Sequence, residues 1–194
     1  MNKLLMRSAA LVLPVMLATA AGAQTMKPPT TPGPATAPSG MAMAQPPAGT
    51  TKTDLSKTDS EFVTKAAEGG LAEVQMAQLA QQKSQNQGVK DFAQHMIDDH
   101  TPNNQKLMTI ASSKGITAPT EPSPAQQKML AKLQGLDGAK FDHAYLTGQV
   151  KAHQAMLKVF QHEATNGRDT DLKSFAETTV PTVQQHVTMA QNTK

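Results

Sequence analysis

The chain of 194 residues contains no cysteine and no tryptophan, and only one tyrosine and five phenylalanines. The lack of cysteine excludes disulfide scaffolds, thiol nucleophiles, zinc ribbons and iron–sulfur clusters. Because aromatic side chains make up 3% of the sequence, few are available to stack on bases, and single-stranded nucleic-acid binding is not expected. Imidazole and carboxylate groups are therefore the side chains with which this protein would hold a transition metal.

Residues 1–23 have the pattern of a secretory signal peptide. Lys3 and Arg7 supply the positive start, residues 8–20 form an apolar stretch, and residues 21–23 (Ala-Gly-Ala) form a small-residue cleavage site. The apolar stretch is too short to span a bilayer, and no cysteine follows it for lipid attachment. We therefore expect an exported mature protein that begins near Gln24. It would have no transmembrane segment after signal cleavage, and would reside in the periplasm or cell envelope or be secreted.

Residues 24–57 are rich in threonine, alanine and glycine, and they include seven prolines and a single acidic residue, Asp54. Such a segment buries too little apolar surface to offset the entropy of ordering it. The composition therefore predicts a disordered tether. A plain spacer is favoured over a segment that binds the cell wall or a partner.

Residues 58–194 form the expected domain, and their charge differs from that of the whole chain. The whole chain carries 18 basic and 15 acidic residues, for a net charge of +3. Five of the basic residues and one of the acidic residues precede residue 58, which leaves 13 and 14 in the domain. The domain is thus close to neutral, and the basic pI gives no argument for a nucleic-acid partner.

Hydrophobic periodicity in this domain is helical, and strand patterns are nearly absent. Turn signals such as Asn86 and Asn166-Gly167 separate consecutive helices. Ser123 followed by Pro124 is typical of an N-cap and the first residue of a helix. Long helices are predicted over residues 59–84, 87–113, 139–165 and 169–191, and a short one over residues 124–133.

Connection lengths restrict how the four long helices pack. The two short turns make consecutive helices antiparallel, whereas about 25 residues link the second long helix to the third. At roughly 3.3 Å per extended residue, this link can cross a bundle about 40 Å long even with a short helix inside it. We predict an all-α, ferritin-like four-helix bundle with this long crossover, and a plain up-down-up-down bundle is the alternative.

Two prolines and a glycine pair interrupt the predicted helices. Pro102 and Pro181 each remove a backbone hydrogen bond and predict local kinks. Gly69-Gly70 disfavours its helix by up to about 1 kcal/mol per glycine relative to alanine. Close approach of another helix to these glycines would compensate for that cost. The alternative explanation is that the glycines leave room for a ligand beside Glu73.

Four polar residues lie on the apolar stripes, one on each long helix: Glu73, His100, His153 and His186. At about 1.5 Å per residue, the first two lie about 20 Å from their turn and the last two about 25 Å from theirs. In a crossover bundle about 45 Å long, whose two turns lie at opposite ends, these levels coincide. Without the crossover they differ by about 5 Å, so the spacing supports convergence and does not decide the topology.

Three imidazoles and a carboxylate that converge in a bundle point to a transition-metal site. The ligand set does not choose among iron, manganese, copper and zinc. Asp99, next to His100, is an additional candidate, either as a ligand or as the acceptor that orients an imidazole N–H. A pair with His95 on the helix surface is the alternative for Asp99. For the four residues together, the alternative is a buried hydrogen-bond network that fixes helix register.

Other polar residues receive local roles. Asp142 and Tyr145 lie toward the other end of their helix and are expected to cap it or to form local hydrogen bonds. Glu163 and Glu177 meet near the last turn and are expected to be solvated. The sequence shows no nucleophilic triad, phosphate loop or base-reading motif, so no catalytic residue is assigned.

Several motifs, in the same order, are shared with a bacterial protein family. They are Phe62 and Ala72-Glu73-Val74; Val89-Lys90-Asp91-Phe92-Ala93 and Met96-Ile97-Asp98-Asp99-His100-Thr101; Phe141-Asp142-His143-Ala144-Tyr145-Leu146 and His153; Phe175-Ala176, Val180-Pro181 and His186. On these residues the domain resembles the domain-of-unknown-function 4142 family (DUF4142), exported proteins assigned to the ferritin-like superfamily and often labelled outer-membrane proteins. The resemblance implies the fold of residues 58–194 and implies no activity.

The chain departs from di-iron proteins of ferritin-like type, which carry Glu-x-x-His on two helices. Ile97 and Val183 stand three residues before His100 and His186, and neither side chain binds metal. The sequence thus favours an exported cell-envelope bundle, a binding or stress-related module rather than an enzyme, with a metal ion or an envelope component as partner. A metal-dependent redox or metal-storage protein and a purely structural scaffold are the alternatives, and the oligomeric state is left open.

Overall fold

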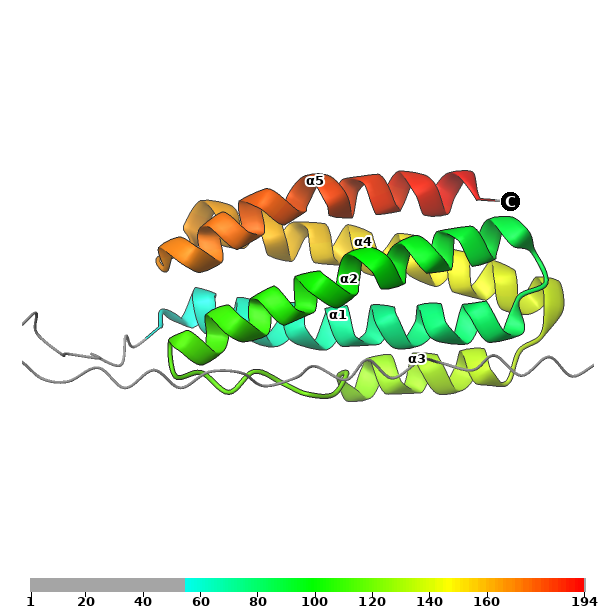
Figure 1. Cartoon of the computed structure of the whole chain (residues 1–194), viewed down its shortest axis with the longest axis horizontal. Helices are drawn as coiled ribbons and strands as arrows, with labels where there is room; N and C mark the ends of the chain where they lie inside the picture. The colour runs from blue at the N-terminus through cyan, green and yellow to red at the C-terminus, as the bar shows by residue number, and fades with distance from the viewer. Residues whose placement is uncertain (1–54, 194) are drawn as a thin grey trace, which may run out of the picture. The chain divides into compact units, whose positions relative to one another are not determined.

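The structure, a computed structural model, describes residues 55–193. The predicted signal peptide (1–23) and residues 24–54 of the predicted tether lie outside the described residues. The described part consists of helices and contains no strand (Figure 1), which confirms the all-α prediction. Its helices are α1 (Lys57–Lys83), α2 (Gln87–Ser113), α3 (Pro124–Gln134), α4 (Gly138–Asn166) and α5 (Thr170–Asn192).

Side-chain caps fix where several helices begin. At α1 the Ser56 hydroxyl accepts from the Asp59 amide, and the Asp59 carboxylate accepts from the Ser56 amide, which satisfies two free donors at once. Ser123 and Gln126 form the same reciprocal pair at α3. At α2 the Asn86 side chain caps the first turn. These caps explain why helix bounds predicted from sequence lie within two residues of those observed.

Polar contacts at the helix ends define the path of the chain. Lys83, at the end of α1, donates to the Gln134 carbonyl at 2.7 Å and pairs with Asp137 at 2.9 Å, beside the start of α4. Lys114, just after α2, pairs with Asp169 at 2.6 Å, beside the α4–α5 turn. The two hairpin turns therefore lie at opposite ends of the helices. Residues 114–137 return the chain from one end to the other, and Figure 1 shows α3 alongside α1 on this return path.

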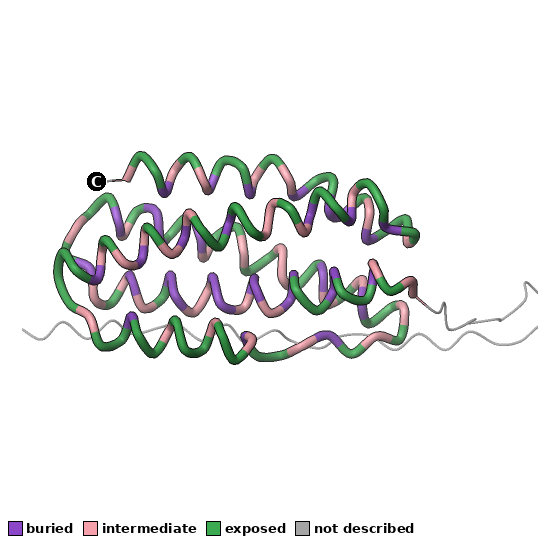
Figure 2. The backbone as a smooth tube through the Cα atoms, turned by 180° about the vertical axis from the view of Figure 1, so that it is seen from behind, coloured by how far each residue is buried: buried purple, intermediate pink, exposed green. Residues whose placement is uncertain are grey.

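Apolar side chains fill the space between the helices in two clusters. One lies toward the α1–α2 turn and includes Phe92, Met96 and Phe141; the other lies toward the α4–α5 turn and includes Phe62 and Phe160. Figure 2 shows buried residues recurring along the inner side of the long helices. All five phenylalanines and the tyrosine are buried, so the few aromatic side chains serve the core. No helix among residues 55–193 is long and apolar enough to cross a membrane.

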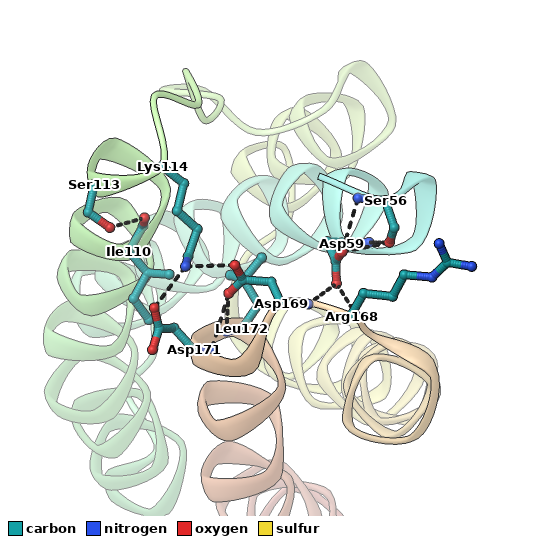
Figure 3. A network of polar contacts seen from close by, with 9 residues as sticks. All are labelled: Ser56, Asp59, Ile110, Ser113, Lys114, Arg168, Asp169, Asp171 and Leu172. Carbon is teal, nitrogen blue, oxygen red and sulfur yellow. Dashed lines mark hydrogen bonds and ion pairs between the residues drawn. The ribbon is translucent and has the colours of Figure 1, made fainter. Parts of the chain in front are cut away.

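The α4–α5 turn is held against the starts of α1 and α5 by a polar network (Figure 3). Asp59, on α1, accepts hydrogen bonds from the backbone N–H groups of Arg168 and Asp169 at 2.8 and 3.2 Å. Lys114 joins Asp169 and Asp171 on the other side of the turn. Burial acts to raise the pKa of Asp59, but hydrogen bonds from Ser56 and from the turn outweigh it and hold that pKa below its usual value. Asp59 is therefore a buried carboxylate that ties two distant segments together.

Glu163 corrects one prediction, because it is completely buried rather than solvated. The turn folds back over it, and the absence of a side chain at Gly167 makes room for its carboxyl group. Glu177, its expected neighbour, is exposed as predicted. Counting residues along the two helices shows that Glu163 and Glu177 both lie near the α4–α5 turn. The count does not show which of the two side chains the turn covers.

Two glycine substitutions on α4 and its following turn are expected to have opposite effects on stability. A Cβ at Gly167 would lie 2.7 Å from the Glu163 backbone oxygen and would also meet its carboxyl group, so Gly167→Ala should destabilise the fold by about 1–3 kcal/mol. A Cβ at Gly148, inside α4, meets nothing within 4 Å. Gly148→Ala should therefore stabilise the fold by up to about 1 kcal/mol. Urea denaturation of both variants tests this pair, and a stabilising Gly167→Ala would contradict the packing described.

Candidate metal centre

Three histidines from three helices meet between the two apolar clusters. His100 comes from α2, His153 from α4 and His186 from α5, and one ring nitrogen of each lies within 4.8 Å of the others. Their ring centroids are 5.5 Å apart for His100 and His153, and 5.2 Å apart for each of the other two pairs. His153 and His186 are almost fully buried, with 2% and 1% of their surface exposed. The crossover brings them together, because it sets the two hairpin turns at opposite ends.

The hydrogen bond of His153 decides which of its nitrogens is free. Nδ1 lies 2.9 Å from the Gln149 carbonyl oxygen, which can only accept, so Nδ1 carries the proton and Nε2 carries the lone pair. That Nε2 lies 3.4 Å from Nε2 of His100. Two nitrogens that bind one metal tetrahedrally, at about 2.0–2.1 Å, are separated by about 3.3–3.4 Å. The pair is therefore spaced as two ligands of one ion would be.

His186 presents an unpaired nitrogen in the interior. Its Nε2 lies 2.9 Å from a carboxylate oxygen of Asp99, so the ring donates its N–H to Asp99. Its Nδ1 is buried and has no hydrogen-bond partner within residues 55–193. A buried lone pair without a donor is rare and unfavourable in the absence of a bound species. Asp99 thus orients His186, and its expected alternative partner His95 lies one turn away on the same helix.

Glu73 approaches the cluster from α1, on a different side of His153. Its Oε1 lies 3.9 Å from His153 Nδ1, the nitrogen already used by Gln149, and its Oε2 has no hydrogen-bond partner among the described residues. Burial raises the pKa of Glu73, while His153 and Gln149 oppose the shift. Glu73, His100 and His153 also line a cavity of about 20 Å³, which is room for about one water molecule.

The electrostatics of the cluster favour neutral imidazoles. Burial, followed by the neighbouring His153 and His186, holds the pKa of His100 well below its usual value. Burial also lowers the pKa of His186, although Asp99 opposes the shift. Neutral imidazole is the form that binds a metal, so these rings need not release a proton to bind one near pH 7.

An open cleft reaches the cluster between α2 and α5. Its volume is about 310 Å³, and its walls include His100 and His186. Lys106 also lines this cleft, and it was not predicted as a site residue from the sequence. Its spacing from His100 and Asn103 along α2 is the sequence feature that could have indicated it. The other lining residues are Asp99, Pro102, Asn103, Thr178, Thr179, Thr182 and Val183.

Two further predictions about polar residues are wrong. Tyr145 is a core aromatic: it stacks on Phe141 with ring centroids 6.0 Å apart, and its hydroxyl has no hydrogen-bond partner in the described part of the chain. Burial, followed by Glu73, holds the pKa of Tyr145 well above its usual value. Asp142 likewise has a buried oxygen without a partner among residues 55–193. Tyr145 packs instead with Leu133 and Phe141 in the apolar cluster toward the α1–α2 turn.

Comparison with known proteins identifies relatives of unassigned function. The profile of a family described as "Domain of unknown function (DUF4142)" matches residues 44–193. No curated protein matches the chain. The crystal structure of a conserved hypothetical protein, Rv2844, from Mycobacterium tuberculosis superposes with a TM-score of 0.55 and 16% identity, covering 69% of this chain and 88% of that one. At this identity, the likeness concerns the fold alone.

Proposed function

The chain belongs to the DUF4142 family, whose description assigns no activity, and we propose that it is an exported helical-bundle protein that binds one transition-metal ion between α2, α4 and α5. The observation that carries this proposal is the cluster of ring nitrogens from His100, His153 and His186, all within 4.8 Å of one another. The buried, unpaired Nδ1 of His186 supports it, because a bound cation would satisfy that lone pair.

The donor set favours zinc or copper over the other metals considered. Imidazole suits zinc, copper and iron, and a given site generally binds Fe²⁺ more weakly than Cu²⁺ or Zn²⁺, whereas manganese prefers carboxylate and water oxygens. Glu73 faces Nδ1 of His153 rather than its free Nε2, so the three donors that face one another are all nitrogens. Asp99 would hold His186 in the binding orientation, and Gln149 would do the same for His153. Such an ion would supply a Lewis-acidic centre inside the bundle.

We also place the bundle in the ferritin-like class. Two antiparallel hairpins joined by a long crossover with an added helix support this assignment. The residues do not fit the di-iron centre of that class, because Ile97 and Val183 occupy the positions where the Glu-x-x-His pattern needs carboxylates. A mononuclear site in a binding module of the cell envelope is therefore favoured over di-iron redox or storage chemistry. The signal-like residues 1–23 support export.

Metal stoichiometry tests the proposal. Equilibrium dialysis of the protein against Zn²⁺ and against Cu²⁺, followed by elemental analysis, should give one ion per chain. In His153→Ala the affinity should fall at least about a hundredfold, because one of three protein ligands is removed. His143→Ala is the matched control, since His143 is exposed on the same helix, and its affinity should be unchanged.

The same experiment separates the metal site from a purely structural role. If the wild-type protein binds no stoichiometric metal, the three histidines form a structural network and the proposal is wrong. Circular dichroism shows whether His153→Ala retains its helical content. Should that variant unfold, His100→Ala replaces it, because His100 lies at the edge of the open cleft and its loss disturbs the interior less.

A further inference from the structure

We propose that the α2–α5 cleft admits a small oxyanion, such as a carboxylate, that binds the metal ion and Lys106 together. This inference rests on the metal site proposed above and assigns a ligand class to it. Its first support is position: the cleft of about 310 Å³ is lined at one end by His100 and His186 and farther along α2 by Lys106. Six residues of helix separate His100 from Lys106, which is about 9 Å along the axis.

Lys106 has no anionic partner among residues 55–193. Its Nζ lies 5.7 Å from the centre of the Phe175 ring, and no carboxylate of residues 55–193 lies within ion-pair distance of it. The cleft does contain the Asp99 carboxylate, but that group already accepts the His186 N–H at 2.9 Å. Lys106 is exposed, so its ammonium group is open to an anion that enters the cleft.

Asn103 adds a donor between the two ends. The Thr179 hydroxyl donates its single proton to the Phe175 carbonyl at 2.7 Å, and its oxygen lies 3.3 Å from the side-chain amide of Asn103. The hydroxyl oxygen can therefore accept one N–H of that amide, and the second N–H is left to donate to a ligand. A metal ion, an amide N–H and an ammonium group along one cleft form a set of positive ends that a carboxylate or similar oxyanion complements.

Each of the two helices that form the cleft contains a proline at this level. Pro102 lies in α2 on the cleft wall and Pro181 lies in α5 next to Thr182, which lines the opposite wall. Both helices continue through their prolines. Each proline lacks an N–H and places its ring against the preceding turn, which disfavours tight straight packing of the two helices at this level.

Cobalt provides a visible probe for the test. The protein is loaded with Co²⁺ and titrated with acetate, and then with acetamide, a neutral molecule of the same size. Acetate should shift the visible absorption of the bound Co²⁺ with a saturable dependence, and acetamide should leave it unchanged. Lys106→Met should weaken acetate binding about tenfold without loss of Co²⁺. Lys128→Met, an exposed change of the same charge on α3, should match the wild type.

The outcomes distinguish this inference from the proposed function. If Co²⁺ does not bind, the proposal of a metal site is wrong, and the proposal of an oxyanion site, which depends on it, is wrong as well. If Co²⁺ binds but 100-fold molar excesses of acetate and of inorganic phosphate leave the spectrum unchanged, the oxyanion site alone is overturned. Equal acetate affinity in Lys106→Met and wild type would also overturn it, because the assignment of Lys106 would then be wrong.

Discussion

Zinc is expected to raise the midpoint temperature of thermal unfolding by about 10 °C when free zinc exceeds the dissociation constant about a thousandfold. Mass action gives about 4 kcal/mol of stabilisation under that condition, provided that the unfolded chain does not bind the ion. The three histidines come from α2, α4 and α5, and no two of them are near in sequence. The unfolded chain therefore lacks the site, and nearly all of the binding energy should appear as folding stability.

Differential scanning calorimetry with and without zinc measures this effect. The shift should disappear in His153→Ala, remain in His143→Ala, and reverse on addition of EDTA. An equal shift in His153→Ala would mean that zinc stabilises the protein from another place, for example through exposed histidines. Zinc that lowers the midpoint in every variant would indicate preferential binding to the unfolded chain.

The apo-protein should be weakened by unpaired buried polar atoms in and beside the proposed metal site. His186 Nδ1 and Glu73 Oε2 are buried and unpaired within the described residues, and an unsatisfied buried polar atom costs about 1–3 kcal/mol. A scaffold selected for stability alone would carry apolar residues at these positions, since such replacements are often neutral or stabilising. This argument supports our proposal of a bound species over a role in fixing helix register.

The parts of this fold that the sequence predicts are those set by period and length. Apolar residues at helical spacing gave α2 at its observed bounds, and Ser123 followed by Pro124 marks the start of α3. The meeting of His100 with His153 follows from counting residues between turns, because a helix has a fixed rise per residue. Neither inference requires knowledge of a distant contact.

The parts that it did not predict depend on side-chain orientation across helices. Periodicity put Glu73 on the inner stripe but did not show that it faces Nδ1 of His153, the nitrogen bound to the Gln149 carbonyl. Asp99 had two candidate partners, and only the packing of α5 against α2 selects His186 over His95. The role of Lys106 was hidden because an exposed lysine on a polar face is common; its lack of a counter-ion appears only in three dimensions.

Replacing Glu163 by glutamine is expected to stabilise the protein, and to do so increasingly as the pH rises. Burial, then the hydrogen bond and charge of Asp59, and then the charge of Asp169, raise the pKa of Glu163 from 4.5 to about 8, with Lys173 opposing the shift. Between these two values the folded protein keeps a proton that the unfolded chain has lost. Protonation of Glu163 therefore contributes to the stability of the folded protein, and this contribution is fully present below about pH 4.5 and is lost as the pH rises toward 8.

The expected difference is large for a single conservative change. Glutamine has the same shape and is never charged, so it removes the penalty of ionising a buried group beside Asp59. Near pH 5 the free energies of unfolding of Glu163→Gln and wild type should be similar. At pH 8.5 the variant should be more stable, by on the order of 3 kcal/mol. Glu177→Gln, an exposed change of the same kind on α5, should show no such gain at either pH.

Urea denaturation at pH 5, 7 and 8.5 measures the three proteins. Histidine protonation also affects stability across this range, because the pKa values of His100 and His186 are lowered in the folded protein. Their contribution is common to wild type and variant, and it cancels in the difference between them. A gain that is the same at pH 5 and pH 8.5 would show that Glu163 is ionised throughout.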